Sequence, residues 1–290
     1  MTDLYDFPEI IGEARCRYGR MVYPGRDWSV GRSLKFYGEF SEGEAAFFKK
    51  VVKPGDAVLE VGANLGAHTV LLARLAGRDG AVLAFEPQPF LFQVLCANLA
   101  LNSITNVRAE KCGLGNRSQT LHIPPLDYGQ MYNFGGLSLE LVKEGEPVPV
   151  KRLDSYGMGK CDFVKMDVEG MEQQVLEGGS DTFQRTRPPM YIENDREAKS
   201  RDLITLLLAM DYVLWWHITP LFNPDNVAGE RANVWARTVS VNMLCVPKEK
   251  LDELKWLSEG MTPVAGPDQW WRELAYTENG QPQDLNQFNR

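Results

Sequence analysis

Short apolar runs recur along the chain, and segments with apolar residues every three to four positions separate several of them. The runs lie at 57–61, 81–85, 107–112, 163–166, 190–193, 212–217 and 239–246. Aliphatic, β-branched runs of this length are typical of buried parallel strands. The segments that follow the first, second and fifth runs predict helices, at about 65–77, 89–101 and 198–210. This alternation predicts an α/β fold with right-handed crossovers between parallel strands.

The alternation stops at both ends and once in the middle. Residues 1–50 predict an extension of turns and short pieces with one helix over 45–52, preceded by a capping box at Ser41–Glu44. This extension either covers a ligand site or packs at an edge. The main domain is expected at 51–247, and 248–290 are expected to form a helix and a poorly ordered tail.

An insertion is expected at about 116–160, between the third and fourth strands of the main domain. Within it, 120–123, 137–141 and 148–150 predict short antiparallel strands, with a loop at 133–136. Loops gather at the carboxyl ends of parallel strands, so the insertion is expected beside the ligand crevice.

Composition narrows the class of protein. The 290 residues carry a net charge of −8 with a pI near 5.1, which argues against nucleic-acid binding through phosphate neutralisation. Five dispersed cysteines without a CxxC pair indicate reduced thiols and a cytoplasmic location. The first residues resemble no signal peptide, and no apolar run is long enough for a bilayer, so no membrane association is expected.

The stretch 57–69, AVLEVGANLGAHT, joins a strand to a helix through a glycine-rich turn. Such a turn opens a nucleotide-binding βαβ unit, but the spacing departs from the dinucleotide fingerprint. Glu60 stands two residues before Gly62. Its carboxylate would repel a pyrophosphate, whereas it would attract the ammonium and sulfonium of S-adenosylmethionine.

A second acid supports this interpretation. Glu86 follows the strand 81–85 and is placed to accept hydrogen bonds from a ribose diol. Packing alone could also explain a glycine turn, but the turn and both acids together favour a cofactor site. The residues predicted to bind the cofactor are Glu60, Gly62, Ala63, Asn64, Gly66, Thr69, Glu86, Pro87, Cys112, Gly113 and Asp167.

These motifs resemble the FkbM family of S-adenosylmethionine-dependent methyltransferases. The resemblance covers most of 37–247 and is carried by 55–66, 85–87, 98–102, 164–172, 191–195 and 240–247. It implies a Rossmann-like class I methyltransferase fold. That fold is a seven-stranded, mostly parallel sheet in the order 3-2-1-4-5-7-6, with the last strand antiparallel and helices on both faces. It also implies methyl transfer, with O-methylation of secondary metabolites or carbohydrates among the family's reactions.

Methyl transfer to an alcohol requires removal of a proton, so carboxylates and histidines at strand ends are candidate bases. The predicted catalytic residues are Asp167 first, then Glu169, Glu193 and His217. Glu169 has an ordinary alternative, because acids favour helix N-termini, but this does not account for Asp167 at the end of its strand. A histidine after two tryptophans is often structural. Asp167, Glu193 and Asn194 are also similar to the oxygen ligands of catechol O-methyltransferase-like enzymes, which suggests a divalent metal such as magnesium.

Three functions remain open from the sequence. The first is O-methylation of a hydroxyl on a small molecule or glycan, with that acceptor as the partner. The second is methylation of nucleic acid or protein, against which the acidic composition weighs. The third is a cofactor-binding protein without turnover. A homo-oligomer is compatible with all three.

Overall fold

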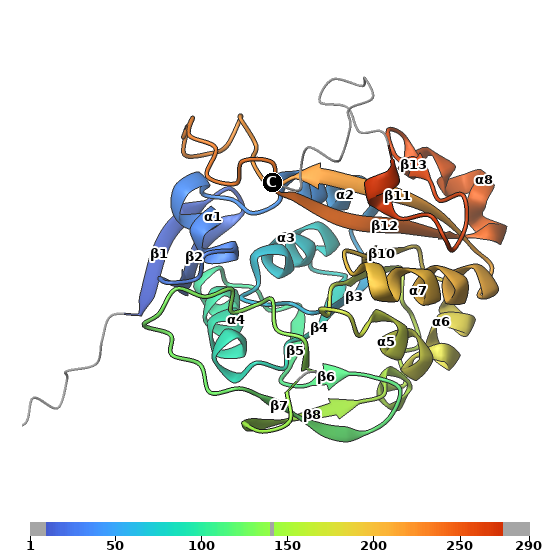
Figure 1. Cartoon of the computed structure of the whole chain (residues 1–290), viewed down its shortest axis with the longest axis horizontal. Helices are drawn as coiled ribbons and strands as arrows, with labels where there is room; N and C mark the ends of the chain where they lie inside the picture. Colours follow the sequence, from blue (N-terminus) through green and yellow to red (C-terminus); the bar gives the residue numbers. More distant parts are fainter. Residues whose placement is uncertain (1–9, 140–141, 275–290) are drawn as a thin grey trace, which may run out of the picture.

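The computed structural model describes residues 10–139 and 142–274, and an eight-stranded sheet lies at the centre of this part of the chain (Figure 1). In spatial order the strands are β5 (Val107–Glu110), β4 (Ala81–Phe85), β3 (Ala57–Val61), β9 (Phe163–Met166), β10 (Met190–Glu193), β12 (Val239–Pro247), β11 (Tyr212–Pro220) and β13 (Thr262–Pro263). The first seven reproduce the predicted order, and β12 runs antiparallel to β10 as expected. The two-residue strand β13, which pairs with β11 at the edge, was not predicted.

Helices cover both faces of the sheet, which confirms the predicted α/β class. One core contains residues of α1 (Val30–Tyr37), α2 (Glu42–Val51), α3 (Ala67–Ala76) and α4 (Pro89–Leu101). The other contains residues of α5 (Glu172–Gly178), α6 (Ser180–Thr186) and α7 (Glu197–Ala209). Successive residues of β3 alternate between these cores, since Val58 packs in the first and Leu59 in the second. Burial on both faces explains the unbroken apolar runs.

The insertion forms a separate three-stranded sheet in the order β6 (Gly113–Leu114), β8 (Glu146–Lys151), β7 (Gln119–Ile123). The strands predicted at 120–123 and 148–150 lie within β7 and β8. The strand predicted at 137–141 is wrong over 137–139, and its last two residues lie outside the described part. Leu139 there packs against Ile123 and Val148 through its side chain instead of pairing as a strand.

The N-terminal region is more ordered than its prolines and glycines predicted. β1 (Ile11–Cys16) and β2 (Gly19–Pro24) form an antiparallel hairpin, and α1 follows. The predicted capping box at Ser41–Glu44 is also wrong, because the two side chains bond each other. Ser41 has a positive φ of 45°, and its hydroxyl donates to Glu44 Oε1 at 2.7 Å instead of capping the backbone of α2.

The C-terminal segment after β12 is not one helix. It is divided into a 3-10 turn (Lys248–Lys250), the short α8 (Leu251–Leu254) and a second 3-10 turn (Lys255–Ser258). Leu251, Leu254 and Leu257 all contribute to the first core, and their spacing of three suits 3-10 geometry. The tail predicted after Trp271 lies mainly outside the described residues. Among described residues no helix has the length and apolar content to cross a membrane.

Asn98 of α4 fastens the N-terminal hairpin to the sheet domain. Its side chain is fully buried, accepts from the Val22 backbone N–H at 2.7 Å and donates to the carbonyls of Val22 and Leu65 at 2.9 and 2.8 Å. The single side-chain amide of Asn98 therefore provides hydrogen-bond partners for backbone groups of both β2 and the turn before α3.

We expect Asn98→Ala to lower the free energy of unfolding by about 2–3 kcal/mol, because it leaves buried backbone groups without partners. Asn102→Ala is the matched control. Asn102 makes similar bonds to Arg20 in a more exposed position, so its loss should cost less than about 1 kcal/mol. Urea unfolding measures both, and equal losses would contradict the role assigned to Asn98.

Candidate functional site

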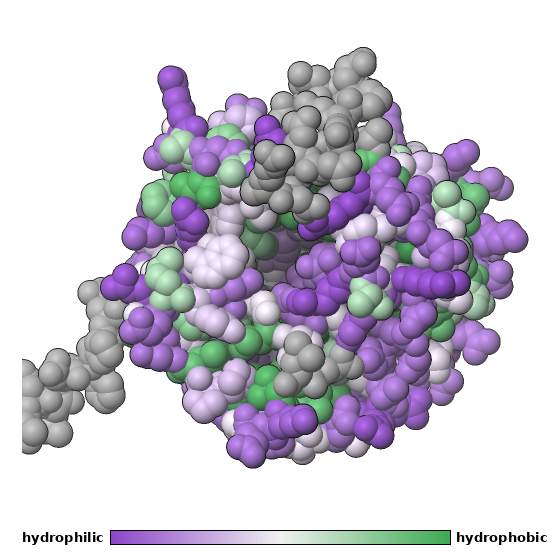
Figure 2. All heavy atoms as spheres, viewed as in Figure 1, coloured by the Kyte–Doolittle hydropathy of each residue, from purple (hydrophilic) through white to green (hydrophobic). Residues whose placement is uncertain are grey.

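A cavity of about 350 Å³ lies at the carboxyl ends of β3, β4, β9 and β10. The cavity is also lined by residues of α2, the turn before α3, β12 and the insertion. Figure 2 shows one face of the molecule, which is hollowed near its middle and carries mostly hydrophilic residues on its surface. A crevice at this edge of an open parallel sheet is where such folds bind ligands.

The glycine turn packs directly on the end of β9. Gly62 has a φ of +84°, and a Cβ added there would lie 1.7 Å from the backbone oxygen of Asp167. Only glycine fits this close approach. Gly66, at φ +89°, begins α3 against Leu95, and neither it nor the buried Thr69 lines the cavity. Those two predicted cofactor residues therefore lie outside the cavity lining. Gly62, Ala63 and Asn64 of the same turn do line the cavity.

Glu86 projects into the cavity from the end of β4. Its two carboxylate oxygens each accept one backbone N–H at 2.8 Å, from Gln88 and from Asn64. Burial raises the pKa of Glu86 to about 7, although these two hydrogen bonds oppose the rise. Pro87, Cys112 and Gly113, which were also predicted to bind the cofactor, line the cavity with it.

Gln88 was not predicted, and it connects this region to the insertion. Its side chain Nε2 donates to the carbonyl of Phe134 at 2.6 Å. Beside it, a Cβ added to Gly135 would lie 2.0 Å from Asn64 Nδ2. The loop between β7 and β8 therefore lies against the glycine turn and forms one wall of the cavity.

Glu60 is fully buried below the turn, and neither of its carboxylate oxygens has a hydrogen-bond partner among the described residues. Burial raises its pKa to about 7, and the charge of Lys165 works against that rise. Lys165, which is 4% exposed, donates to the carbonyl of Gly62 and to Asp167 Oδ2, both at 3.1 Å. Lys165 was not predicted as a site residue, although a charged residue inside an apolar strand could have indicated it.

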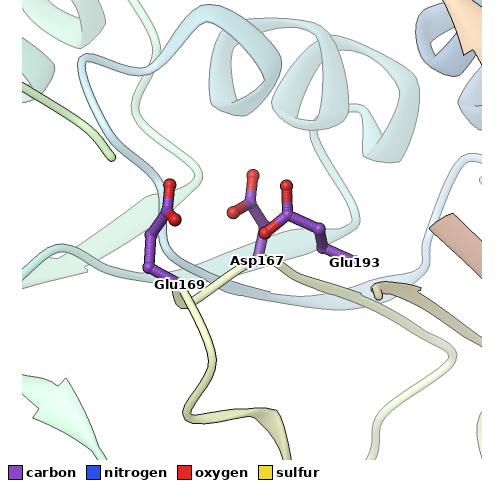
Figure 3. A group of neighbouring side chains, drawn as sticks. All are labelled: Asp167, Glu169 and Glu193. Atoms are coloured by element: carbon purple, nitrogen blue, oxygen red, sulfur yellow. The ribbon is translucent and has the colours of Figure 1, made fainter. Parts of the chain in front are cut away.

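Three acids meet beyond Lys165. One carboxylate oxygen of each of Asp167, Glu169 and Glu193 lies within 4.8 Å of the others. Figure 3 shows the Asp167 and Glu193 side chains next to one another, while Glu169 stands to one side with its carboxylate pointing the same way. Glu169 has a φ of 57° and forms an ion pair with Arg196, a cavity residue that was not predicted.

The charge states of this acidic cluster, Asp167, Glu169 and Glu193, differ. Burial would raise the pKa of Asp167, but Lys165 and a hydrogen bond with Glu193 hold it below its usual range. Burial and the charge of Asp167 raise the pKa of Glu193 well above the usual range. Burial and the same charge raise the pKa of Glu169 to about 8. Asp167 is therefore the most readily ionised member, and the ion pair with Arg196 favours the charged form of Glu169 against the rise in its pKa. Glu193 is a protonated neighbour able to donate to Asp167.

The predicted metal ligand Asn194 does not join this cluster. Its amide is 3% exposed, donates to Ser200 Oγ at 3.0 Å and lies 3.4 Å from Met243 Sδ. Consecutive residues of an extended segment point to opposite faces, so Glu193 and Asn194 cannot face one site together. Glu169, instead of Asn194, is the third residue of the cluster with Asp167 and Glu193. A hard cation suits three carboxylates, yet Lys165 and Arg196 already pair with two of them.

His217, the weaker catalytic candidate, does not line the cavity. Its Nδ1 shares a hydrogen bond of 2.7 Å with the Tyr191 hydroxyl, and its ring lies 5.8 Å from that of Phe47. Burial lowers its pKa to about 4. The structure therefore corrects this prediction in favour of the structural alternative.

Residues before the first sheet strand form another wall of the cavity. Ser29, Val30, Phe40 and Glu44 all line it. Glu44 is 4% exposed and accepts hydrogen bonds from the hydroxyls of Ser41 at 2.7 Å and Ser240 at 2.6 Å. His68, the second residue of α3, also lines the cavity and was not predicted.

Comparison with known proteins gives concordant matches. The family model described as the methyltransferase FkbM domain matches residues 60–214, more than half of the chain. Methyltransferase 1 of Beauveria bassiana (strain ARSEF 2860) is 29% identical over 153 residues, covering 44% of this chain and 60% of that protein. The 31-O-demethyl-FK506 methyltransferase FkbM of Streptomyces tacrolimicus is 26% identical over 204 residues, covering 59% and 78%.

Among solved structures, methyltransferase FkbM from Methylobacillus flagellatus KT aligns with a TM-score of 0.46 at 17% identity, covering 69% of this chain and 50% of that one. The match to the Beauveria protein leaves about two fifths of that relative's length outside the alignment. On the extent of the family-model match, the chain belongs to the FkbM methyltransferase domain family.

Proposed function

We propose that this protein is an S-adenosylmethionine-dependent methyltransferase that methylates a hydroxyl group of a small molecule or carbohydrate. The observation that carries the proposal is the unpartnered, fully buried carboxylate of Glu60 in the same cavity as Glu86. A buried carboxylate without a partner is costly, and a cationic ligand would offset that cost. Membership of the FkbM domain family supports the same donor.

The residues present fit the donor. Glu60 would hold its ammonium group, and Glu86 would accept hydrogen bonds from its ribose hydroxyls, since each carboxylate oxygen keeps a second lone pair beside its backbone N–H. Gly62 leaves the turn without a side chain, so the peptide groups stay open to the ligand. When bound, S-adenosylmethionine supplies a methyl group already activated by a positive sulfonium.

The remaining lining residues indicate the acceptor's charge. Seven carboxyl side chains line the cavity against one lysine and one arginine: Glu44, Glu60, Glu86, Asp167, Glu169, Glu193 and Asp195, against Lys165 and Arg196. Glu60, Glu86, Glu169 and Glu193 have raised pKa values and are at least partly protonated near pH 7, so the surface is less negative than this number of acids. It offers two cations to a phosphate or carboxylate and many carboxyl groups that can bond a hydroxyl, which suits a neutral acceptor. This supports a hydroxylated small molecule or glycan over a nucleic acid. One contribution of the protein to rate is alignment of the reactants in the cavity.

The function is tested by incubating the protein with methyl-tritiated S-adenosylmethionine and a panel of alcohols, phenols, sugars, RNA and a protein mixture. We expect label in a neutral hydroxylated compound and not in RNA or protein. We also expect labelling to survive EDTA, because Lys165 and Arg196 already balance two acids of the acidic cluster. Labelling confined to RNA or protein would contradict the proposed acceptor, and loss of labelling restored by Mg²⁺ would establish a metal site.

Glu86→Gln should weaken S-adenosylhomocysteine binding about tenfold, or about 1.4 kcal/mol. The amide offers one oxygen instead of two, so a ribose hydroxyl and a backbone N–H compete for it. Titration calorimetry measures the change. Glu110→Gln, at the end of the neighbouring β5 and outside the cavity, is the control and should bind normally. Unchanged affinity in Glu86→Gln would remove Glu86 from the donor site.

The affinity for S-adenosylhomocysteine should rise as pH increases from 5.5 to 8. Glu60 has a pKa raised to about 7, so at low pH it is protonated and cannot balance the ligand's ammonium. A cation favours the ionised form, and binding therefore tightens as pH passes 7. Calorimetry across this range should show a several-fold change that is reduced in Glu60→Gln. The same pH slope in the variant would place the ammonium elsewhere.

A further inference from the structure

His68 begins α3 directly after the glycine turn and is enclosed by two aromatic rings. Its ring centroid lies 5.5 Å from that of Phe40 and 5.1 Å from that of Phe48. The side chain is 6% exposed and lines the cavity. The rings leave this imidazole little freedom to turn, so its position relative to the cavity is fixed by packing.

One ring nitrogen of His68 has a hydrogen-bond partner and the other has none. The ring donates a hydrogen bond to the backbone carbonyl of Phe40. Nε2 is buried and has no hydrogen-bond partner among the described residues. With the donor hydrogen committed to Phe40, Nε2 carries the lone pair of a neutral imidazole. A buried acceptor of this kind is costly unless a ligand supplies a hydrogen to it.

The surroundings of His68 keep its imidazole neutral near pH 7, and they include carboxylates that would stabilise a positive charge on the ring. Burial lowers the pKa of His68, and Lys165 lowers it further. Glu44 from α2 and Asp167 after β9 act in the opposite direction. The ring is therefore unprotonated before reaction, and two carboxylates are close enough to stabilise an imidazolium once it forms.

The other basic groups at this end of the cavity are already occupied. Asp167 pairs with Lys165 and bonds with Glu193, and Glu169 pairs with Arg196. Glu44 accepts two serine hydroxyls. Glu60 and Glu86 belong to the donor site proposed above. Asp195 Oδ1 lies 3.9 Å from Arg196 Nε. Among the described residues that line the cavity, His68 Nε2 is a basic atom that makes no hydrogen bond.

We propose that His68 is the general base that removes the proton of the acceptor hydroxyl. The inference rests on the proposed function. The O–H bond breaks and Nε2 gains the proton, while the acceptor oxygen bonds to the methyl carbon. The carbon–sulfur bond breaks with its electron pair left on sulfur. The products are a methyl ether, neutral S-adenosylhomocysteine and an imidazolium beside Glu44 and Asp167.

A first experiment needs no acceptor. The chain has three histidines, His68, His122 and His217, so their NMR resonances can be assigned with His→Gln variants and titrated from pH 5 to 7.5. We expect His68 to titrate at a lower pH with S-adenosylmethionine than with S-adenosylhomocysteine, because only the former carries a positive sulfonium. His217, outside the cavity, should not respond.

Equal titration of His68 in the two complexes, or a rise in both, would overturn the proposal, because it would place the ring at the amino-acid end that both ligands share. Failure of both ligands to bind would instead refute the proposed function, since the donor site itself would be absent. The two failures are therefore distinguishable.

A second experiment uses the best acceptor from the panel. His68→Gln should lower kcat about a hundredfold or more, which is the range for loss of a general base. Its Kd for S-adenosylhomocysteine should stay within about twofold, and the acidic limb of the pH profile should disappear. His217→Gln is the matched control, another buried histidine, and should keep kcat. His68→Phe, which fills the space between the two rings, replaces the Gln variant if that protein does not fold.

Weakened donor binding with an unchanged kcat would make His68 a donor-binding residue and refute the base. An unchanged pH profile with a normal kcat would make it structural. Either result overturns the proposal.

Discussion

The site depends on one close approach, between the glycine turn after β3 and the end of β9. The backbone oxygen of Asp167 occupies the space where any Cβ on residue 62 would lie. Lys165 then joins the two segments, since it bonds the carbonyl of Gly62 and the carboxylate of Asp167. Through this contact the donor side and the acidic side of the cavity are held as one unit, and neighbouring strands bring Glu60 and Lys165 into register.

Concentrating buried charge in this way requires compensation, and the chain supplies much of it internally. Burying an isolated ion is costly unless it is paired or its pKa shifts. The carboxylate of Asp167 is paired with Lys165. The raised pKa of Glu193 keeps that side chain protonated and therefore uncharged. Glu60 differs, because neither of its oxygens has a hydrogen-bond partner among the described residues. Glu193 Oε2 and His68 Nε2 in the same cavity also lack partners there, and such atoms indicate where a ligand completes the arrangement.

The sequence was most informative where burial leaves few choices. The runs 57–61, 81–85, 163–166 and 190–193 match β3, β4, β9 and β10 residue for residue, because central parallel strands must be apolar on both faces. The strands of the insertion were harder to predict. β8 contains two prolines, and the leucines of 137–139 pack without forming a strand. Among the residues that line the cavity, Glu60 and Glu86 were predicted from their motifs. His68 and Lys165 were missed because their roles depend on packing partners far along the chain, Phe40 for one and Gly62 for the other.

The bond from Gln88 to Phe134 has a consequence for how such an enzyme can diversify. Gln88 holds the insertion loop by a main-chain oxygen, which every amino acid provides. The identity of the residues along that loop is therefore largely separated from its attachment beside Glu86. Natural variation or laboratory evolution can change the cavity wall that this loop forms, while its attachment next to Glu86 stays the same.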